Sequence, residues 1–288
     1  MNYEKKPLSA GLYFVSTPIG AARDITLRAL DILASADVIA AEDTRTIRHL
    51  MEIHGIALEG RPLVAYHDHN GAERRPRLMR YLAEGKSVAY ASEAGTPLVA
   101  DPGFALGRAA IEAGMPVFAA PGPSAVLAAL TVSGLPTDRF LFAGFAPTGK
   151  GQRVKTLKEL AQVPATVVLY ESPKRVHKLL VDLVQCFGED RQAVVCRELT
   201  KRFEETVRGS LKELAEAFAG RSVKGEVVVL VDRLSDQAVQ TETLEEALRS
   251  AMKTMSVKDA AALVSQSFSQ PKRVVYQMAL KLSADQRD

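Results

Sequence analysis

The sequence predicts an α/β fold with a mainly parallel, helix-covered sheet, a second α/β domain and a helical tail. Over the first 232 residues, short runs of β-branched and aromatic residues alternate with segments of helical period, a pattern typical of parallel sheets covered by helices. After these residues the strand-like runs stop and only helical periodicity continues. A chain of 288 residues is long enough for two domains. We expect two α/β domains, at 1–120 and 121–235, and a helical tail at 236–288.

The first expected domain contains five strands, each followed by a helix or a turn. The expected strands are residues 12–15, 38–41, 62–67, 87–92 and 116–120. The first helix is marked by leucines at helical spacing, Leu27, Leu30 and Leu33. Three other helices end at a glycine, a common residue just after a helix end: Gly55, Gly85 and Gly114.

The pattern restarts at Pro121 with a turn and a helix. Further strands are expected at 139–145, 166–171, 193–198 and 225–232, and residues 147–155 (PTGKGQRVK) read as a flexible polar loop. In the tail, two residue pairs fit capping boxes that begin helices, Thr243 with Glu246 and Ser256 with Asp259. Pro271 fits the first position of the last helix.

Composition excludes several classes of protein. Hydrophobic residues make up 47% and charged residues 25%, and the net charge of +3 is too small to argue by itself for nucleic acid binding. Cys186 and Cys196 have neither metal-site nor disulfide-framework spacing, so we expect core thiols. The polar N-terminus and the absence of a run of 18 apolar residues predict no signal peptide, no membrane span and a cytoplasmic protein.

Glycine, proline and serine gather after the first, fourth and fifth expected strands. The segments are STPIG (16–20), SEAGTPLVADPG (92–103) and PGPSA (121–125). In open parallel sheets, ligands bind outside the carboxyl ends of the strands. Small residues let a ligand approach the backbone, and prolines stiffen the loops. The chain has no G-x-G-x-x-G and no G-x-x-x-x-G-K-[ST] segment, so we expect neither a dinucleotide nor a nucleoside triphosphate here.

Together with LYESPKRV (169–176) and RELTKRFE (197–204), these three segments resemble the tetrapyrrole methylase superfamily. Within it, they resemble the ribosomal small-subunit RNA methyltransferase I family, in order from residue 11 to about 232. One departure is Glu93, where the family pattern has aspartate. The resemblance implies two α/β domains of the tetrapyrrole methylase type with S-adenosylmethionine in the cleft between them. It also implies 2′-O-methylation of a decoding-centre cytidine in 16S rRNA, with free rRNA or the assembled 30S subunit as partner, and a homodimer.

The resemblance also assigns residues to the cofactor. They come from all five segments: Pro18, Ala94, Gly95, Thr96, Val99, Ser124, Ala125, Tyr170, Leu199 and Thr200. Removing the proton of a ribose hydroxyl needs a nearby acceptor. Candidates are Glu42, His67 and Glu93 at strand ends and Lys174 of the second domain, with Asp43, Asp68 and Lys201 also considered. His67 and His69 flank Asp68, but no further cluster supports a metal, and we expect none.

RNA contacts are predicted from local charge. Residues 139–178 contain eight basic and two acidic residues, a net of +6, whereas the whole chain carries +3. Lysine and arginine contact phosphates without reading bases. The predicted contacts are Lys150, Arg153, Lys155, Lys158, Lys174 and Arg175.

Two other functions stay open from the sequence. A tetrapyrrole or corrinoid precursor methyltransferase would share the cofactor loops but would not need the basic stretch. A non-catalytic RNA-binding ribosome-assembly factor on the same fold would keep the basic stretch without needing the cofactor loops.

Overall fold

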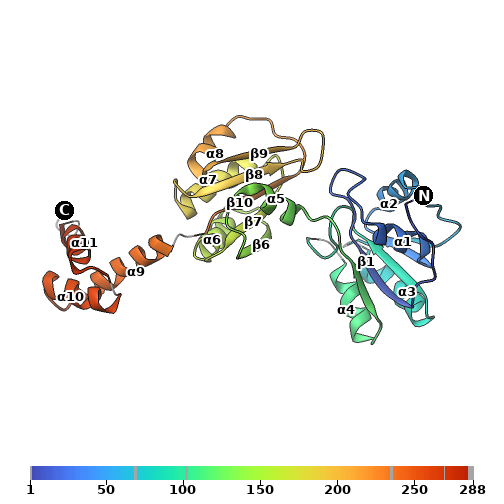
Figure 1. Cartoon of the computed structure of the whole chain (residues 1–288), viewed down its shortest axis with the longest axis horizontal. Helices are drawn as coiled ribbons and strands as arrows, with labels where there is room; N and C mark the ends of the chain where they lie inside the picture. Colours follow the sequence, from blue (N-terminus) through green and yellow to red (C-terminus); the bar gives the residue numbers. More distant parts are fainter. Residues whose placement is uncertain (1, 68–69, 101–102, 234–235, 269, 285–288) are drawn as a thin grey trace. The chain divides into compact units, whose positions relative to one another are not determined.

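The computed structural model describes the chain apart from residues 1, 68–69, 101–102, 234–235, 269 and 285–288 (Figure 1). Residues 1–160 and 166–232 form one compact unit, and residues 161–165 and 233–288 form a second. The first unit carries both sheets. The domain boundaries expected at residues 120 and 235 remain predictions.

The first sheet is parallel throughout, in the order β3-β2-β4-β1-β5. Its strands are β1 (Gly11–Val15), β2 (Val38–Ala41), β3 (Leu63–Ala65), β4 (Ser87–Ala91) and β5 (Val117–Ala120). The connecting helices are α1 (Leu27–Ser35), α2 (Thr44–Ile53), α3 (Gly71–Ala83) and α4 (Phe104–Glu112). The five expected strands are therefore all present, within two residues at each end.

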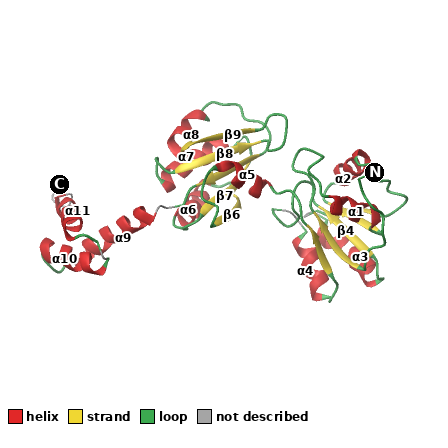
Figure 2. Ribbon diagram, in the orientation of Figure 1, coloured by secondary structure: helices red, strands yellow, loops and turns green. Residues whose placement is uncertain are grey.

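Alternating side chains of the first sheet form two separate cores. In β1, Tyr13 and Val15 belong to the core that includes buried residues of α1 and α2. Leu12 and Phe14 belong to the opposite core, with buried residues of α3 and α4. Because successive side chains of a strand point to opposite faces, a strand covered by helices on both faces must be apolar at every position. Figure 2 shows this arrangement of helices about the strands.

The second sheet is mixed, in the order β6-β7-β10-β8-β9. Its strands are β6 (Phe140–Phe145), β7 (Thr166–Glu171), β8 (Gln192–Arg197), β9 (Glu205–Ser210) and β10 (Val227–Val231). Only β6 and β7 pair in parallel; β10 runs antiparallel to β7 and β8, and β9 antiparallel to β8. The helices of this half are α5 (Ala125–Ser133), α6 (Lys150–Ala161), α7 (Val176–Phe187) and α8 (Leu211–Ala217). Strand β9 was not predicted from the sequence.

Helix α6 corrects the loop predicted at residues 147–155, because the helix already begins at Lys150. Of the two cysteines, Cys196 is buried as expected, whereas Cys186 is only partly buried.

The second unit contains α9 (Asp236–Ala251), α10 (Val257–Ser267) and α11 (Lys272–Ala284), which pack around a small apolar core. Ser256 caps α10 as predicted, since its side chain accepts a hydrogen bond from the Asp259 backbone N–H. The capping box expected at Thr243 is wrong, because α9 starts at Asp236 and Thr243 lies inside it. Among the described residues, no helix is long and apolar enough to cross a membrane.

Candidate functional site

Three loops at the carboxyl ends of β1, β4 and β5 are hydrogen-bonded to one another. Thr17 and Gly95 exchange two backbone hydrogen bonds, each of 3.0 Å. The Ser92 hydroxyl donates to the Gly95 carbonyl at 2.6 Å, and the Thr96 hydroxyl donates to the Pro123 carbonyl at 2.9 Å. The small polar residues that marked these loops in the sequence therefore largely serve to hold the loops together.

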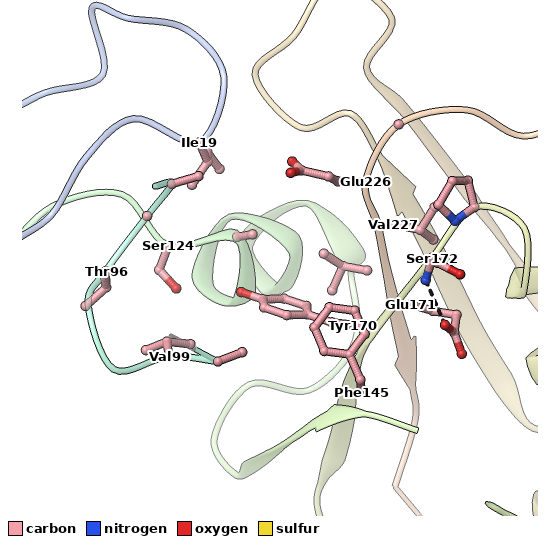
Figure 3. A pocket seen from close by; sticks show the side chains of 17 residues that line it. Ile19, Thr96, Val99, Ser124, Phe145, Tyr170, Glu171, Ser172, Glu226 and Val227 are labelled. Atoms are coloured by element: carbon pink, nitrogen blue, oxygen red, sulfur yellow. Dashed lines mark hydrogen bonds between the residues drawn. The ribbon is translucent and has the colours of Figure 1, made fainter. Parts of the chain in front are cut away.

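A cavity of about 380 Å³ opens beside these loops. It is lined by loop residues of the first half and by residues of α5, β6, β7 and β10 of the second: Ile19, Ala94, Gly95, Thr96, Val99, Ala100, Ser124, Ala125, Phe145, Tyr170, Glu171, Ser172, Pro173, Gly225, Glu226, Val227 and Val228. Apolar surface with a few placed polar groups is typical of small-molecule and cofactor sites. Figure 3 shows Thr96, Val99, Ser124 and Tyr170 around one space.

Ser124 and Tyr170 supply hydroxyl groups to the cavity wall. Ser124 stands at the N-cap of α5, yet its side chain makes no capping hydrogen bond. A serine at this position normally caps the helix, so the Ser124 hydroxyl is available to a ligand, whereas the backbone N–H of Val126 in the first turn of α5 is hydrogen-bonded to the Tyr170 phenol. Burial raises the pKa of the Tyr170 phenol, which keeps it a neutral hydrogen-bonding group at physiological pH. The Phe145 ring lies 5.7 Å from the Tyr170 ring.

The amino end of β10 adds a charged cluster, of which only Lys201 had been considered from the sequence. Glu226 lines the cavity, and its carboxylate accepts a hydrogen bond from Lys201 Nζ at 2.9 Å. Lys201 also donates to Glu198 at 3.0 Å. Burial alone would lower the pKa of Lys201, but the hydrogen bonds to the two carboxylates outweigh it and raise that pKa. Lys201 is therefore a protonated ion-pair partner, not the proton acceptor considered from the sequence.

Gly225 must be glycine for this cluster to form. Its φ is +86°, and a Cβ at this position would lie 2.2 Å from the Glu198 side-chain carboxyl carbon. No Cβ can lie this close to the Glu198 carboxyl group, so this position requires glycine, which has no side chain. The same Glu198 carboxylate accepts the Glu226 backbone N–H at 3.0 Å, so the turn before β10 is built around it.

Seven of the ten residues assigned to the cofactor line the cavity: Ala94, Gly95, Thr96, Val99, Ser124, Ala125 and Tyr170. The other three, Pro18, Leu199 and Thr200, do not. Thr200 instead accepts the Ala21 backbone N–H at 3.1 Å, and Leu199 packs in the apolar cluster that contains Ile19. These two residues thus hold the first loop beside the cavity, and all ten cofactor assignments remain predictions.

The four proposed catalytic residues, Glu42, His67, Glu93 and Lys174, are not among the residues that line the cavity. His67 follows β3, where its backbone N–H donates to the Asn70 side chain at 2.9 Å. Glu93 and Lys174 are exposed. Glu42 follows β2, and its backbone N–H donates to the Ala91 carbonyl at 3.4 Å.

The remaining two acids considered from the sequence have separate positions. Asp43 caps α2 and pairs with Arg45, whose side-chain hydrogen bond lowers the pKa of Asp43 to about 2. Asp68 and His69 lie outside the described residues. Within the described part of the chain, no group of three or more metal-binding side chains is present.

The basic stretch divides into exposed and buried members. Lys150, Lys155, Lys158 and Lys174 are exposed and open to phosphate contact. The prediction for Arg153 is wrong: only 1% of this residue is exposed, and its guanidinium pairs with the buried Asp182 carboxylate at 2.7 Å.

Arg153 also donates hydrogen bonds to the Pro147 and Thr148 carbonyls at 3.1 and 2.8 Å. Its role is thus to fix the segment before α6. Arg175 is partly buried, paired with Glu171 at 3.1 Å and donating to the Ala146 carbonyl at 2.7 Å. Much of its hydrogen-bonding capacity is therefore used inside the protein.

Comparison with known proteins gives a consistent result. Residues 11–215 match the family model of the tetrapyrrole (corrin/porphyrin) methylases, and residues 237–283 match that of the RsmI C-terminal HTH domain. A ribosomal RNA small subunit methyltransferase I from Mesorhizobium japonicum is 46% identical over 96% of this chain and 94% of its own length. The protein of the same name from Vibrio cholerae is 42% identical over 94% of each chain.

Solved structures with similar folds are more distant. Diphthine synthase matches with a TM-score of 0.60 and 20% identity, over 77% of this chain and 89% of its own. A cobalt precorrin-4 methyltransferase matches with a TM-score of 0.58 and 21% identity, over 77% and 94%. Uroporphyrin-III C-methyltransferase from Thermus thermophilus, solved with S-adenosyl homocysteine, matches with a TM-score of 0.53 and 21% identity, over 80% and 99%. These structures support the fold, and the closer sequences narrow the family: the chain belongs to the tetrapyrrole methylases and, within them, to the ribosomal RNA small subunit methyltransferase I family.

Proposed function

We propose that the protein transfers a methyl group from S-adenosylmethionine to the 2′-hydroxyl of a cytidine ribose in the decoding centre of small-subunit rRNA. Its use of S-adenosylmethionine and its membership of an rRNA methyltransferase family follow from the relatives described above. The observation that carries the proposal is the 46% identity to a named rRNA methyltransferase over nearly the whole chain. The ribose position and the particular nucleotide are the proposed part.

The residues of the cavity suit this cofactor. S-adenosylmethionine has no phosphate, and the cavity has no glycine-rich phosphate loop. A charged amino acid end, a ribose and an adenine need hydrogen-bonding groups beside apolar walls. The hydroxyls of Ser124 and Tyr170 supply the hydrogen-bonding groups, and Ile19 and Val99 supply the apolar walls. When bound, the cofactor would supply an activated methyl group, and the protein's part is to hold and orient it.

Orientation is the largest contribution available to this site. Methyl transfer requires an in-line approach of the nucleophile, and correct placement can supply several kcal/mol of the barrier. The three hydrogen-bonded loops form a preorganised wall, because the hydroxyls of Thr17 and Thr96 donate between loops and that of Ser92 donates within the β4 loop. Such a wall does not have to be ordered at each turnover.

We add Glu226 to the candidates for proton acceptor, because it is the carboxylate that combines cavity lining with exposure. Its side chain is 72% exposed, whereas that of the other cavity glutamate, Glu171, is 1% exposed. In Figure 3 the Glu226 carboxylate extends toward Ile19, while the Glu171 carboxylate lies beside the Ser172 backbone. General base catalysis typically contributes about 10²- to 10⁴-fold.

The test of Glu226 is a pair of variants, Glu226→Gln and Glu226→Asp. A proton acceptor predicts a large loss of the single-turnover rate in Glu226→Gln, partial rescue in Glu226→Asp, and unchanged cofactor affinity. A merely structural role predicts that Lys201→Met, which breaks the same ion pair, slows transfer as much as Glu226→Gln does.

The RNA is proposed to lie with its backbone on the exposed lysines of α6, Lys150, Lys155 and Lys158, and on Lys174. In the sequence, Lys174 directly follows the cavity residue Pro173, and α6 begins five residues after the cavity residue Phe145. Contacts of this kind give affinity without sequence readout.

Two rival functions are separated from this proposal by simple measurements. A tetrapyrrole or corrinoid precursor methyltransferase would methylate such a precursor in vitro, and an assembly factor without catalysis would show no saturable binding of S-adenosylmethionine. The direct test is mass spectrometry of rRNA nucleosides from cells with and without the gene. The proposal predicts the loss of one 2′-O-methylcytidine from small-subunit rRNA. Unchanged modification, or loss of a base methylation instead, would contradict it.

A further inference from the structure

Helix α11 presents one face to its own unit and another to solvent. Val275, Ala279 and Leu282 are buried with α9 and α10 in the core of the second unit. Apart from the exposed Val274, the exposed residues of α11 are called the α11 face below: Lys272, Arg273, Tyr276, Gln277, Leu280 and Lys281. Tyr276 is 38% and Leu280 47% exposed, so large side chains lie on the surface among the cations.

Charge in the helical tail is segregated even though its total is balanced. Residues 236–288 contain seven basic and seven acidic residues. Helix α9 holds four of the acidic residues and a single arginine, whereas α11 has three basic residues and no acidic one. A helix without acids that exposes lysine, arginine, tyrosine and glutamine together has the composition of a nucleic-acid contact.

The pair of helices α10 and α11 resembles a helix-turn-helix, in which the second helix contacts the nucleic acid. Helices α10 and α11 are packed together and are separated by four residues, 268–271. In helix-turn-helix proteins, the residues near the start of the second helix reach the nucleic acid. Lys272 and Arg273 are the first two residues of α11, and Tyr276 lies one turn further along.

Resting on the function proposed above, we propose that the α11 face is a second rRNA-binding surface, which holds the phosphate backbone of the substrate. Lys272, Arg273 and Lys281 pair with phosphates, and Tyr276 and Gln277 donate hydrogen bonds to phosphate or ribose oxygens. The deep, narrow major groove of A-form RNA does not admit a reading helix. The surface therefore adds affinity and salt dependence without base specificity.

The experiment compares two triple variants of the full-length protein. The first is Lys272→Ala, Arg273→Ala and Lys281→Ala. The control is Arg249→Ala, Lys253→Ala and Lys258→Ala, which removes the same charge from exposed positions of the same unit outside α11. Small-subunit rRNA affinity is measured over a salt series, together with single-turnover methylation at saturating RNA and calorimetric binding of S-adenosylmethionine.

The α11 variant is expected to bind rRNA about tenfold more weakly at 0.1 M salt. The slope of log affinity against log salt concentration should be flatter by about two to three, because each lost phosphate contact lowers that slope by about 0.7–0.9. Its cofactor affinity and its rate at saturating RNA stay at the wild-type values, and the control keeps wild-type RNA binding. The proposal would be overturned if the α11 variant kept wild-type RNA affinity and salt slope, or if the control variant lost as much affinity. It would also be overturned if the α11 variant changed its oligomeric mass while its RNA binding stayed the same. If wild-type protein binds rRNA through α11 but transfers no methyl group to it, the proposed function fails while this surface stands.

Discussion

Replacing Gly95 by alanine tests whether the β4 loop forms the cofactor wall. Gly95 has φ of +85°, and an added Cβ would lie 3.3 Å from Ile19 Cγ2 and 3.6 Å from the Pro123 carbonyl oxygen. A residue with a side chain pays about 1–2 kcal/mol in this left-handed region, and the methyl group also presses on Ile19. The free protein can relieve this strain by shifting the loop. Cofactor binding must then return the loop to its strained position, and this strain weakens the binding.

The expected result follows from that strain. Every 1.4 kcal/mol changes an equilibrium constant tenfold, so Gly95→Ala should weaken S-adenosylmethionine binding by roughly 5- to 30-fold. In Gly95→Val the branched side chain adds further methyl groups beside Ile19 and Pro123, and binding should be lost. The assay is calorimetric titration, with thermal unfolding to confirm that each variant is folded.

The matched control is Gly114→Ala. Gly114 has φ of +68° and no atom within 4 Å of an added Cβ, so this variant carries a similar backbone cost away from the cavity. It should unfold a few degrees earlier and bind the cofactor normally. A folded Gly95→Ala protein with wild-type affinity would show that the loop is not part of the cofactor site.

Three further predictions concern stability, RNA binding and assembly. Arg153→Ala should lower the free energy of unfolding by about 3–5 kcal/mol, because it leaves the Asp182 carboxylate buried without its partner; unchanged thermal unfolding would contradict this. Replacing Lys150, Lys155 and Lys158 together by alanine should flatten the salt dependence of RNA affinity by about 0.7–0.9 per lost phosphate contact, and an unaltered slope would mean that α6 does not bind RNA. The family resemblance predicts a homodimer, so light scattering at micromolar concentration should give twice the chain mass of 31.2 kDa, and the monomer mass would refute it.

The first sheet was predictable because its strands are buried on both faces. All five positions of β1 and of β4 are buried, which produces continuous apolar runs that stand out in a sequence. Strand β9 lies at the edge of the second sheet and is only partly buried. Its sequence, ETVRGS, has a single apolar residue, so neither hydrophobic alternation nor a buried run marks it.

The start of α6 was missed for a different reason. Gly149 and Gly151 are typical of a loop, and propensity alone favours one. The helix is fixed instead by tertiary contacts, since Leu157 is fully buried and Arg153 pairs with Asp182 of α7. The same ion pair explains why local charge counting assigned Arg153 to RNA: a sequence does not show which arginine lies next to a buried carboxylate.

The part of the candidate site at the ends of the parallel strands was predicted, whereas the part at the start of the antiparallel strand β10 was missed. The rule that ligands lie at the carboxyl ends of strands found the loops after β1, β4 and β5. Strand β10 runs antiparallel to β7, with Val227 opposite Glu171, so its amino end reaches the same cavity. Gly225 and Glu226 precede that strand and were therefore not considered.

The most direct test of the central claim is methyl transfer by the purified protein. S-adenosylmethionine with a labelled methyl group is incubated with small ribosomal subunits from cells that lack the gene, and the rRNA is digested and analysed by mass spectrometry. The account predicts label in 2′-O-methylcytidine, at no more than one per subunit, with wild-type protein and none with Gly95→Val. Cofactor binding without label in the rRNA, or label on a nucleobase, would contradict it.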